Sequence, residues 1–454
     1  MKHPVIGLLA LSWTCGCAPA ATPCEPVDGA SGPGLFSGET HDFQVGPLKL
    51  RRTTIDASAC GPAWISIADI DNDDGYELMV SKLGVIGSGQ VGPGEVTIYD
   101  RDGDTGQWNR SPLVSTSEGL LLPQTAEIAD LDDDGDLDAI IPSGFFVCGF
   151  IPWLAPCGGI SWMEQREDRW VRHPIVPPVT SHFYHSAIRV DLNRDGILDL
   201  VSVAEEWAGK EGEGYAALQW FAGTGTATPF RPIPITMAEG LGSILSMADI
   251  DGDSDMDFAS AEYFHQKGAS FVWVEQVQAP KDENDPGVWQ RHIIDDQSGP
   301  SIDFMLIPNL LGDGRLAAIG TNHTNTTEDS TDPTSGVFLF EIPDDPTLPW
   351  IKTQISSGIV SVPGRGAGAP GIAGHGDLDG DGDIDLMVSG DGDPRVFLFL
   401  QEENKRFTQL TLEPFLSQAG GMKMIDFDQD GQQDFFITGY DERVIYHYEV
   451  QSTL

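Results

Sequence analysis

Basic residues, cysteines and long apolar stretches are scarce in this chain. Only 25 of its 454 residues are Lys or Arg, against 70 Asp and Glu, and the formal net charge is −45. Nucleic acids and anionic lipids are bound by basic surfaces, so this balance argues against both classes of partner. Beyond the N-terminus, no stretch reaches the ~18 apolar residues of a membrane-spanning helix. The sequence also lacks a P-loop, a GxGxxG turn and a Ser/His/Asp spacing, so no motif commits the chain to a reaction.

The acid excess does not indicate disorder. Hydrophobic residues make up 40% of the chain and 11 residues are Trp, which is enough apolar material for a folded core. Gly (53) and Pro (31) are plentiful and are typical of a turn-rich all-β chain. The acidity therefore requires a structural or metal-binding explanation.

Residues 1–17 (MKHPVIGLLALSWTCGC) have the features of an export signal. Lys2 precedes an apolar stretch that is too short to span a bilayer as a mature helix. The residues TCGC (14–17) resemble the box before the lipidated cysteine of bacterial lipoproteins, which predicts lipidation at Cys17; simple cleavage after APA (18–20) is the alternative. We expect an exported monomer, either an outer membrane lipoprotein, periplasmic or extracellular, with any membrane contact made through this anchor. Residues 18–47, rich in Pro, Gly and Ser, are expected to be a flexible tether.

Export would permit disulfides. Cys148 and Cys157 flank the residues FIPWLAP and are expected to clip that loop, which leaves Cys24 and Cys60 as a second pair. Free buried thiols are the alternative for all four. The loop at 144–159 is rich in apolar residues, which favours an interaction patch or a segment folded over the edge of the protein.

One acidic element occurs seven times at intervals of about 60 residues. It reads, for example, ADLDDDGDLDA at 129–139 and GDLDGDGDIDL at 376–386. A second element, such as WNRSPL at 108–113 or WQRHII at 289–294, recurs with the same period. Two independent elements that share one period indicate an internal repeat. The first positions of the acidic elements are Asp69, Asp130, Asp191, Asp249, Asn309, Asp377 and Asp426.

Each repeat carries signals for four β-strands. Short β-branched and aromatic runs, such as LMVS (78–81) and VTIYD (96–100), follow each acidic loop, and the Trp or Phe element follows them. Seven such units predict a seven-bladed β-propeller in an all-β fold spanning 48–454. A solenoid is the alternative, but it needs capping units that the sequence does not show. An unpaired fourth strand at 50–55 and a last unit with three strands predict that 50–55 runs beside 444–448 and closes the ring.

The acidic loops have the donor set of a calcium site. In the loop from Asp130, carboxylates stand at positions 1, 3, 5 and 9, and Gly135 at position 6 permits the tight turn that gathers them. Calcium takes six to eight oxygens, and the carbonyl at position 7 would add one. Crowded carboxylates repel each other without a counter-ion. An EF-hand needs Glu at position 12 and flanking helices, whereas position 12 here is Ile141 and the flanks are strands.

These repeats resemble the FG-GAP/VCBS family, the group that contains the integrin α-subunit propeller. The resemblance covers residues from about 48 to the C-terminus, and it implies a calcium-stabilised propeller with about six Ca²⁺ sites. It does not indicate a function. Acidic loops that merely solvate one face are the alternative. The expected side-chain ligands, at positions 1, 3, 5 and 9, are Asp69, Asp71, Asp73 and Glu77; Asp130, Asp132, Asp134 and Asp138; Asp191, Asn193, Asp195 and Asp199; Asp249, Asp251, Asp253 and Asp257; Asp377, Asp379, Asp381 and Asp385; and Asp426, Asp428, Asp430 and Asp434.

Three details modify this expectation. The carbonyl ligands at position 7 are expected from Asp136, Ile197, Asp255, Asp383 and Gln432. Position 6 is Asp74 in the first loop and Ser254 in the fourth, where the missing glycine predicts weaker sites. The fifth loop has Leu311 and Ala317 at ligand positions, so no metal is expected there.

The opposite face carries the unusual side chains. Gln124, His185, Ser243 and Asp303 share one position of the first strand and are expected to line the inner mouth. Histidines, carboxylates and aromatics from adjacent blades are typical of a polar or sugar pocket. Ordinary surface residues of long loops are the simpler interpretation. The candidates for a ligand face are His182, Tyr184, His185, Glu205, Glu206, Trp207, Glu262, Tyr263, His265, Asp303 and His323.

Two functions remain open from the sequence. The first is an exported, calcium-stabilised scaffold for binding or adhesion to a protein or a glycan. The second is a propeller enzyme of carbohydrate lyase, dehydratase or hydrolase type, with a His/Glu site on the face opposite the calcium loops. Catalysis would require His182, His185, Glu205, Glu262, His265 and His323 to converge at one concave spot.

Overall fold

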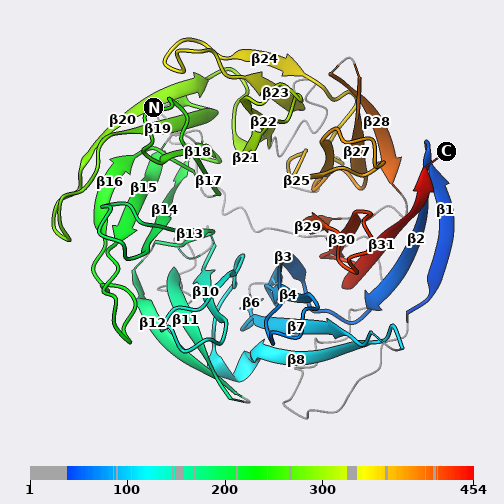
Figure 1. The fold of residues 1–454 in the computed structure, drawn as a ribbon, viewed down its shortest axis with the longest axis horizontal. Helices are drawn as coiled ribbons and strands as arrows, with labels where there is room; N and C mark the ends of the chain where they lie inside the picture. The colour runs from blue at the N-terminus through cyan, green and yellow to red at the C-terminus, as the bar shows by residue number, and fades with distance from the viewer. Residues whose placement is uncertain are drawn as a thin grey trace, which may run out of the picture.

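A computed structural model describes residues 38–453, apart from 85, 88–89, 104, 146–147, 149–157, 168, 181, 211–212, 243, 265–267, 325–334, 363–366, 404, 413–415 and 417. Seven antiparallel sheets stand in a ring around one axis (Figure 1). The protein is therefore an all-β, seven-bladed propeller, as the repeat predicts.

The first three blades follow the chain in order. Blade 1 consists of β3 (Pro62–Ala68), β4 (Glu77–Lys82), β7 (Glu95–Arg101) and β8 (Trp108–Val114), with a small hairpin of β5 (Ile86–Gly87) and β6 (Gln90–Val91). Blade 2 consists of β9 (Glu127–Ala129), β10 (Asp138–Ser143), β11 (Gly158–Arg166) and β12 (Arg169–Thr180). Blade 3 consists of β13 (Ala187–Val190), β14 (Asp199–Lys210), β15 (Glu213–Phe221) and β16 (Ile235–Glu239). A 3₁₀ turn, Thr116–Glu118, precedes blade 2.

Blades 4 to 6 have the same four-stranded order. Blade 4 consists of β17 (Leu245–Ala248), β18 (Asp257–Ala261), β19 (Phe271–Gln278) and β20 (Val288–Asp295). Blade 5 consists of β21 (Ser301–Pro308), β22 (Leu316–Asn322), β23 (Val337–Glu341) and β24 (Ile351–Gln354). Blade 6 consists of β25 (Ala373–Gly376), β26 (Asp385–Ser389), β27 (Val396–Glu402) and β28 (Arg406–Leu412).

The last blade joins the two ends of the chain. It contains β29 (Ala419–Ile425), β30 (Asp434–Gly439) and β31 (Val444–Thr453), and β31 pairs antiparallel with β2 (Leu48–Asp56). Leu50 lies opposite Val450, so the predicted closure is confirmed. A fifth strand, β1 (Thr40–Val45), pairs with β2 on its outer side. The expectation of a tether through residue 47 is therefore wrong for residues 40–45, because β2 offers them a free sheet edge.

One strand boundary also differs from the sequence prediction. The repeat places the fourth strand of blade 3 at 230–235, but β16 begins at Ile235. Pro232 and Pro234 lie in the predicted segment, and proline has no N–H to donate to a sheet ladder. Only Phe230 keeps a bridge, to Gly223.

The hydrophobic core is divided between the blades. Seven clusters of buried apolar side chains each combine residues from two neighbouring blades, including the cluster that joins blade 7 to blade 1 through Ile55, Phe436 and Trp108. Each blade is thus stabilised by its neighbours, and the closed ring leaves no end blade uncovered. In the described part of the chain, no helix has the length and apolar character to cross a membrane.

Candidate functional site

All seven acidic loops connect the first and second strands of their blades and share one backbone geometry. The side chain at position 1 accepts a hydrogen bond from the N–H of position 6, as Asp130 does from Gly135 at 3.1 Å. The carboxylate at position 5 accepts one from the N–H of position 7, as Asp134 does from Asp136 at 3.0 Å. The degenerate fifth loop keeps both bonds, from Gly314 to Asn309 and from Arg315 to Asp313. Loop shape is therefore set by these local bonds.

Positions 4 and 6 have left-handed backbones in every loop. At position 6, φ is 96° at Gly135, 73° at Asp74 and 76° at Ser254. Glycine adopts this conformation freely, whereas a serine there is strained. The sequence prediction that position 6 needs glycine thus has its structural reason, and the fourth loop keeps its fold at a cost.

Replacing Ser254 with glycine is expected to stabilise the protein. The substitution relieves left-handed strain, which costs about 1 kcal/mol for a residue with a side chain. We expect a higher melting temperature for Ser254→Gly in EGTA. Gly135→Ala, the reverse change at the matched position, is the control and should lower it. Equal melting temperatures for both variants would contradict the argument.

The carboxylate at position 9 is buried and held from two sides. Asp385 is fully buried and accepts hydrogen bonds from the backbone N–H of Leu378 at 2.8 Å and of Gln401 at 2.7 Å. Burial raises the pKa of Asp385, Asp257 and Glu77 to about 7, and that of Asp138 to about 6. Burial therefore favours the protonated form, and the charged form of these carboxylates carries a desolvation cost.

Five loops bring three carboxylates together with ligand atoms within 4.8 Å of one another. At position 3 of these loops, burial first and then repulsion from neighbouring aspartates raises the carboxyl pKa. The third loop differs because Asn193 stands at position 3, where its amide donates to Asp195 at 3.0 Å. In the fifth loop, the Lys405 ammonium contacts Asp313 at 3.3 Å. The five groups are Asp69, Asp71 and Glu77; Asp130, Asp132 and Asp134; Asp249, Asp251 and Asp257; Asp377, Asp379 and Asp385; and Asp426, Asp428 and Asp430.

These groups fit a calcium ion. Their donors are oxygens only, which a hard cation prefers. Within the described part of the chain, buried oxygens of Asp130, Asp132 and Asp426 have no hydrogen-bond partner, and a buried polar atom without a partner is costly. A cation at the centre would satisfy these atoms and offset the mutual repulsion of the carboxylates.

The position 9 carboxylates predict how pH acts on stability. Burial raises their folded pKa above the unfolded value of about 4, so they stabilise the metal-free fold when protonated. That stabilisation is present below about pH 4 and is lost as pH rises through about 6 to 7. Calcium requires the charged form and should offset this loss. We expect melting temperatures with calcium and with EGTA to diverge as pH rises from 5 to 7.5; parallel curves would contradict this.

The predicted ligand face is mostly buried. His185 is 8% exposed, Glu205 and Glu262 are each 1% exposed, and Asp303 is 5% exposed. His185 Nδ1 lies 2.9 Å from Gln124 Oε1, and its Nε2 lies 3.9 Å from Glu205 Oε2. Burial lowers the pKa of His185 to about 3, and burial followed by repulsion from Glu262 raises the pKa of Glu205 well above its usual value. Gln124, His185 and Glu205 thus form a buried polar network that joins blades 2 and 3, and the Glu262 carboxylate of blade 4 is close enough to repel Glu205.

Other candidates have partners of their own among the described residues. His182 Nε2 lies 3.6 Å from Glu206 Oε2, and the His182 ring stacks on Tyr215. Buried His323 lies 3.4 Å from Asp391 of blade 6 and contacts the Tyr263 ring. Buried Tyr184 donates to Gln219 at 3.2 Å, and Asp303 accepts from the Ala373 N–H at 2.9 Å.

Some sequence predictions fall on residues that are not described. These are Cys17, Cys24, Cys157, Ser243 and His265, together with the side chain of Trp207, so the pairing of Cys24 with Cys60 stays a prediction. Cys60 and Cys148 are both disulfide-bonded, which rules out free thiols at these two positions. The pairing of Cys148 with Cys157 stays a prediction.

An apolar cluster lies beside His185, and the sequence did not predict it. Leu83, Leu122, Cys148, Phe183 and Phe264 come from blades 1 to 4 and are buried together. The Phe183 and Phe145 rings contact His185 edge-on, at 5.3 and 5.4 Å between centroids. Each of these residues belongs to a different loop, so no local sequence pattern predicts that they pack together. The sequence analysis also did not identify the buried ion pair of Lys82 with Glu95, at 2.8 Å, in blade 1. Lys82 stands five residues after position 9 of its loop, which is the place that Glu262 has in blade 4.

Comparison with solved structures found matches of low sequence identity. A Bacillus licheniformis rhamnogalacturonan lyase is 14% identical, with 92% of this chain and 76% of that chain covered and a TM-score of 0.43. A periplasmic gluconolactonase of Pseudomonas aeruginosa is 14% identical, with coverage of 83% and 96% and a TM-score of 0.48. BBS1N, solved in complex with ARL6DN, is 9% identical, with coverage of 91% and 98% and a TM-score of 0.49. Similarity at this level carries no argument about activity. A search of curated proteins gave no match.

A family model agrees with the repeat assignment. The model described as an FG-GAP-like repeat matches residues 191–260 and 377–437, which contain the acidic loops of blades 3, 4, 6 and 7. The matched stretches lie in a ring of seven blades whose loops share one hydrogen-bond pattern. The chain is therefore an FG-GAP-type seven-bladed β-propeller.

Proposed function

We propose that this protein is an exported, calcium-stabilised scaffold that binds a protein or a glycan. The observation that carries the calcium part is the gathering of three carboxylates in five loops, with buried oxygens that have no hydrogen-bond partner among the described residues. A propeller of this kind is rigid, since each blade is fixed by two neighbours. Rigid rings present their connecting loops as a binding surface.

The export part rests on the sequence. The basic and apolar pattern at 1–17 and Cys17 support export as a lipoprotein or a secreted protein. Disulfides at Cys60 and Cys148 fit an oxidising compartment. Cell fractionation tests this directly: the mature chain should leave the cytoplasm, and Cys17→Ser should abolish membrane association if the anchor is lipid.

The enzyme alternative receives less support. Its His and Glu candidates, among the described residues, fall into separate pairs and a buried network rather than one open concave spot. Proton transfer to a substrate needs a group within hydrogen-bond reach of it, and His185 is buried with the Phe183 and Phe145 rings packed against it. Binding is therefore the function that the geometry favours.

Calorimetry and a glycan array test the proposal together. The EGTA-stripped chain should bind five or six Ca²⁺ ions, and failure to bind any would overturn the calcium part. On the array, hits should appear with calcium and disappear with EGTA. A product formed from a hit would replace the scaffold with the enzyme alternative. Absence of glycan hits would leave a protein ligand as the scaffold's partner, to be tested by cross-linking on the cell surface.

A further inference from the structure

The acidic loops contact one another around the ring. In three places, the side chain at position 4 of one loop donates a hydrogen bond to the backbone carbonyl at position 6 of the next loop. Position 4 lies between two expected ligands, at positions 3 and 5, and position 6 precedes the expected carbonyl ligand at position 7. The three bonds are Gln429 Nε2 to Asp74 O at 2.8 Å, Arg194 Nη2 to Ser254 O at 3.0 Å and Asn72 Nδ2 to Gly135 O at 3.5 Å.

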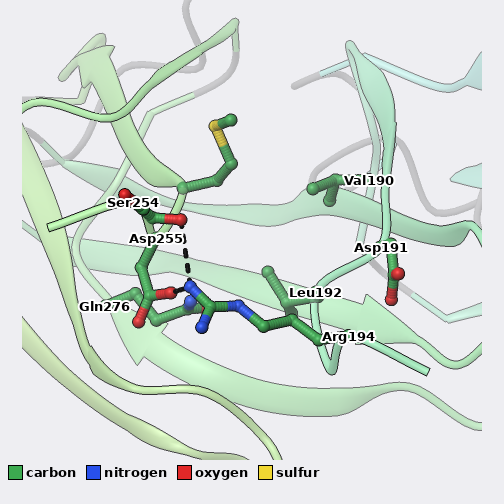
Figure 2. A pocket seen from close by; sticks show the side chains of 8 residues that line it. Val190, Asp191, Leu192, Arg194, Ser254, Asp255 and Gln276 are labelled. Carbon is green, nitrogen blue, oxygen red and sulfur yellow. Dashed lines mark hydrogen bonds and ion pairs between the residues drawn. The ribbon is translucent and has the colours of Figure 1, made fainter. Parts of the chain in front are cut away.

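The contact from Arg194 is the most extensive. Its guanidinium reaches from the third loop to the fourth, where it also forms an ion pair with the Asp255 carboxylate at position 7 (Figure 2). A cavity of about 270 Å³ lies between the two loops and is lined by Asp191, Arg194 and Asp255 among others. Arg194 is therefore the bridge across this junction, and the peptide between positions 6 and 7 of the fourth loop is held by it.

At the other four junctions, the residues that the structure describes form no such position 4 bond. Position 4 of the second loop is Asp133, whose carboxylate cannot donate to a carbonyl. Position 4 is glycine in the fourth, fifth and sixth loops, at Gly252, Gly312 and Gly380, so no side chain is present to reach across. The position 4 bonds therefore join the described loops of blades 7, 1 and 2 and those of blades 3 and 4. The loops of blades 5 and 6 have no position 4 bond and are connected instead through Gln401, whose side chain donates to Leu310 O at 2.9 Å.

We propose that the linked loops bind calcium cooperatively, with Gln429, Asn72 and Arg194 as positioning residues. This inference rests on the proposed calcium binding. An ion held at positions 1, 3 and 5 fixes the intervening position 4, and its side chain then fixes the position 6 carbonyl of the next loop. That loop then loses less conformational entropy when its own ion binds, so binding at one site favours binding at the next. Loops without a position 4 bond lack this route of coupling.

The test compares calcium titrations of the full, EGTA-stripped chain and three variants. Gln429→Ala and Arg194→Ala each remove one link. Asp133→Ala is the matched control, because it has the same position and a φ of 60°, against 58° at Gln429 and 60° at Arg194, but makes no link. All three therefore put alanine into the same strained backbone. Melting temperatures in EGTA confirm that the variants are folded.

We expect the unmodified chain and Asp133→Ala to give titrations steeper than independent sites allow. Gln429→Ala and Arg194→Ala should flatten the curve and weaken the downstream sites by about two- to tenfold, the effect of one hydrogen bond. Removing a ligand of loop 7, with Asp428→Ala, should weaken loop 1 only when Gln429 is present. Curves that superimpose on the Asp133→Ala curve would overturn the coupling and leave calcium binding intact. Absence of calcium binding in every protein would overturn the proposed function itself.

Discussion

We expect EGTA to lower the melting temperature of this propeller by roughly 8 °C at a calcium concentration ten times the dissociation constant. Mass action gives about 1.4 kcal/mol for each site under that condition, or about 7 kcal/mol for five sites. A domain of about 400 residues has an unfolding entropy near 0.8 kcal/mol per kelvin, which converts that energy into the stated shift. Differential scanning calorimetry with calcium and with EGTA measures it.

Two variants check that the shift comes from the loops. Asp379→Ala removes a carboxylate from the sixth loop and should reduce the gap between the two melts by about one fifth. Asp313→Ala changes the fifth loop, which lacks ligand side chains at Leu311 and Ala317, and should leave the gap unchanged. An EGTA melt equal to the calcium melt would show that the carboxylate groups are stable without a metal and that their geometry is set by the hydrogen bonds at positions 1 and 5 alone.

The fold and the metal loops could be predicted because both are local and repeated. The strands and turns of one blade lie within about 60 residues, and position 6 signals its left-handed backbone by glycine in the loops that have it. The closure of the ring followed from counting strands at the two ends. Strand β1 was not predicted because it lies outside the repeat of about 60 residues and pairs only with the outer edge of β2.

The ligand face could not be predicted in the same way. The sequence predicts His185, Glu205 and Glu262 near one mouth of the ring, and in the structure His185 Nε2 lies 3.9 Å from Glu205 Oε2. Their burial depends on Phe183, Phe264 and other residues of separate loops. A buried polar cluster stabilises the fold, whereas the sequence analysis expected an exposed one that binds a ligand. The links from Gln429 and Arg194 were also missed, because position 4 is variable within the repeat and acts on a different repeat.

Removal of β2 is expected to have the largest effect of any change. Leu48, Leu50 and Ile55 of this strand are at most 1% exposed, and the loss of each side chain costs about 2–5 kcal/mol. Asp56 also accepts hydrogen bonds from Tyr99 Oη at 2.6 Å and Arg110 Nη1 at 3.2 Å in blade 1. The cost of losing these three side chains, the Asp56 hydrogen bonds and the strand pairing together exceeds the stability of an ordinary domain, which is about 5–15 kcal/mol. A chain that begins after Asp56 should therefore fail to fold or should aggregate.

A chain that begins at Gly46 separates closure from simple shortening. It lacks β1, whose side chains from Thr40 to Asp42 are exposed, but it keeps the pairing of β2 with β31. We expect this chain to remain folded, with a melting temperature a few degrees lower because Phe43 and Val45 no longer contact the core of blades 6 and 7. Circular dichroism and size-exclusion chromatography of the two chains give the comparison. Equal stability of the two shortened chains would mean that the propeller does not depend on its closing strand. The ring would then persist with β31 as an open edge and with the apolar face of blade 7 uncovered.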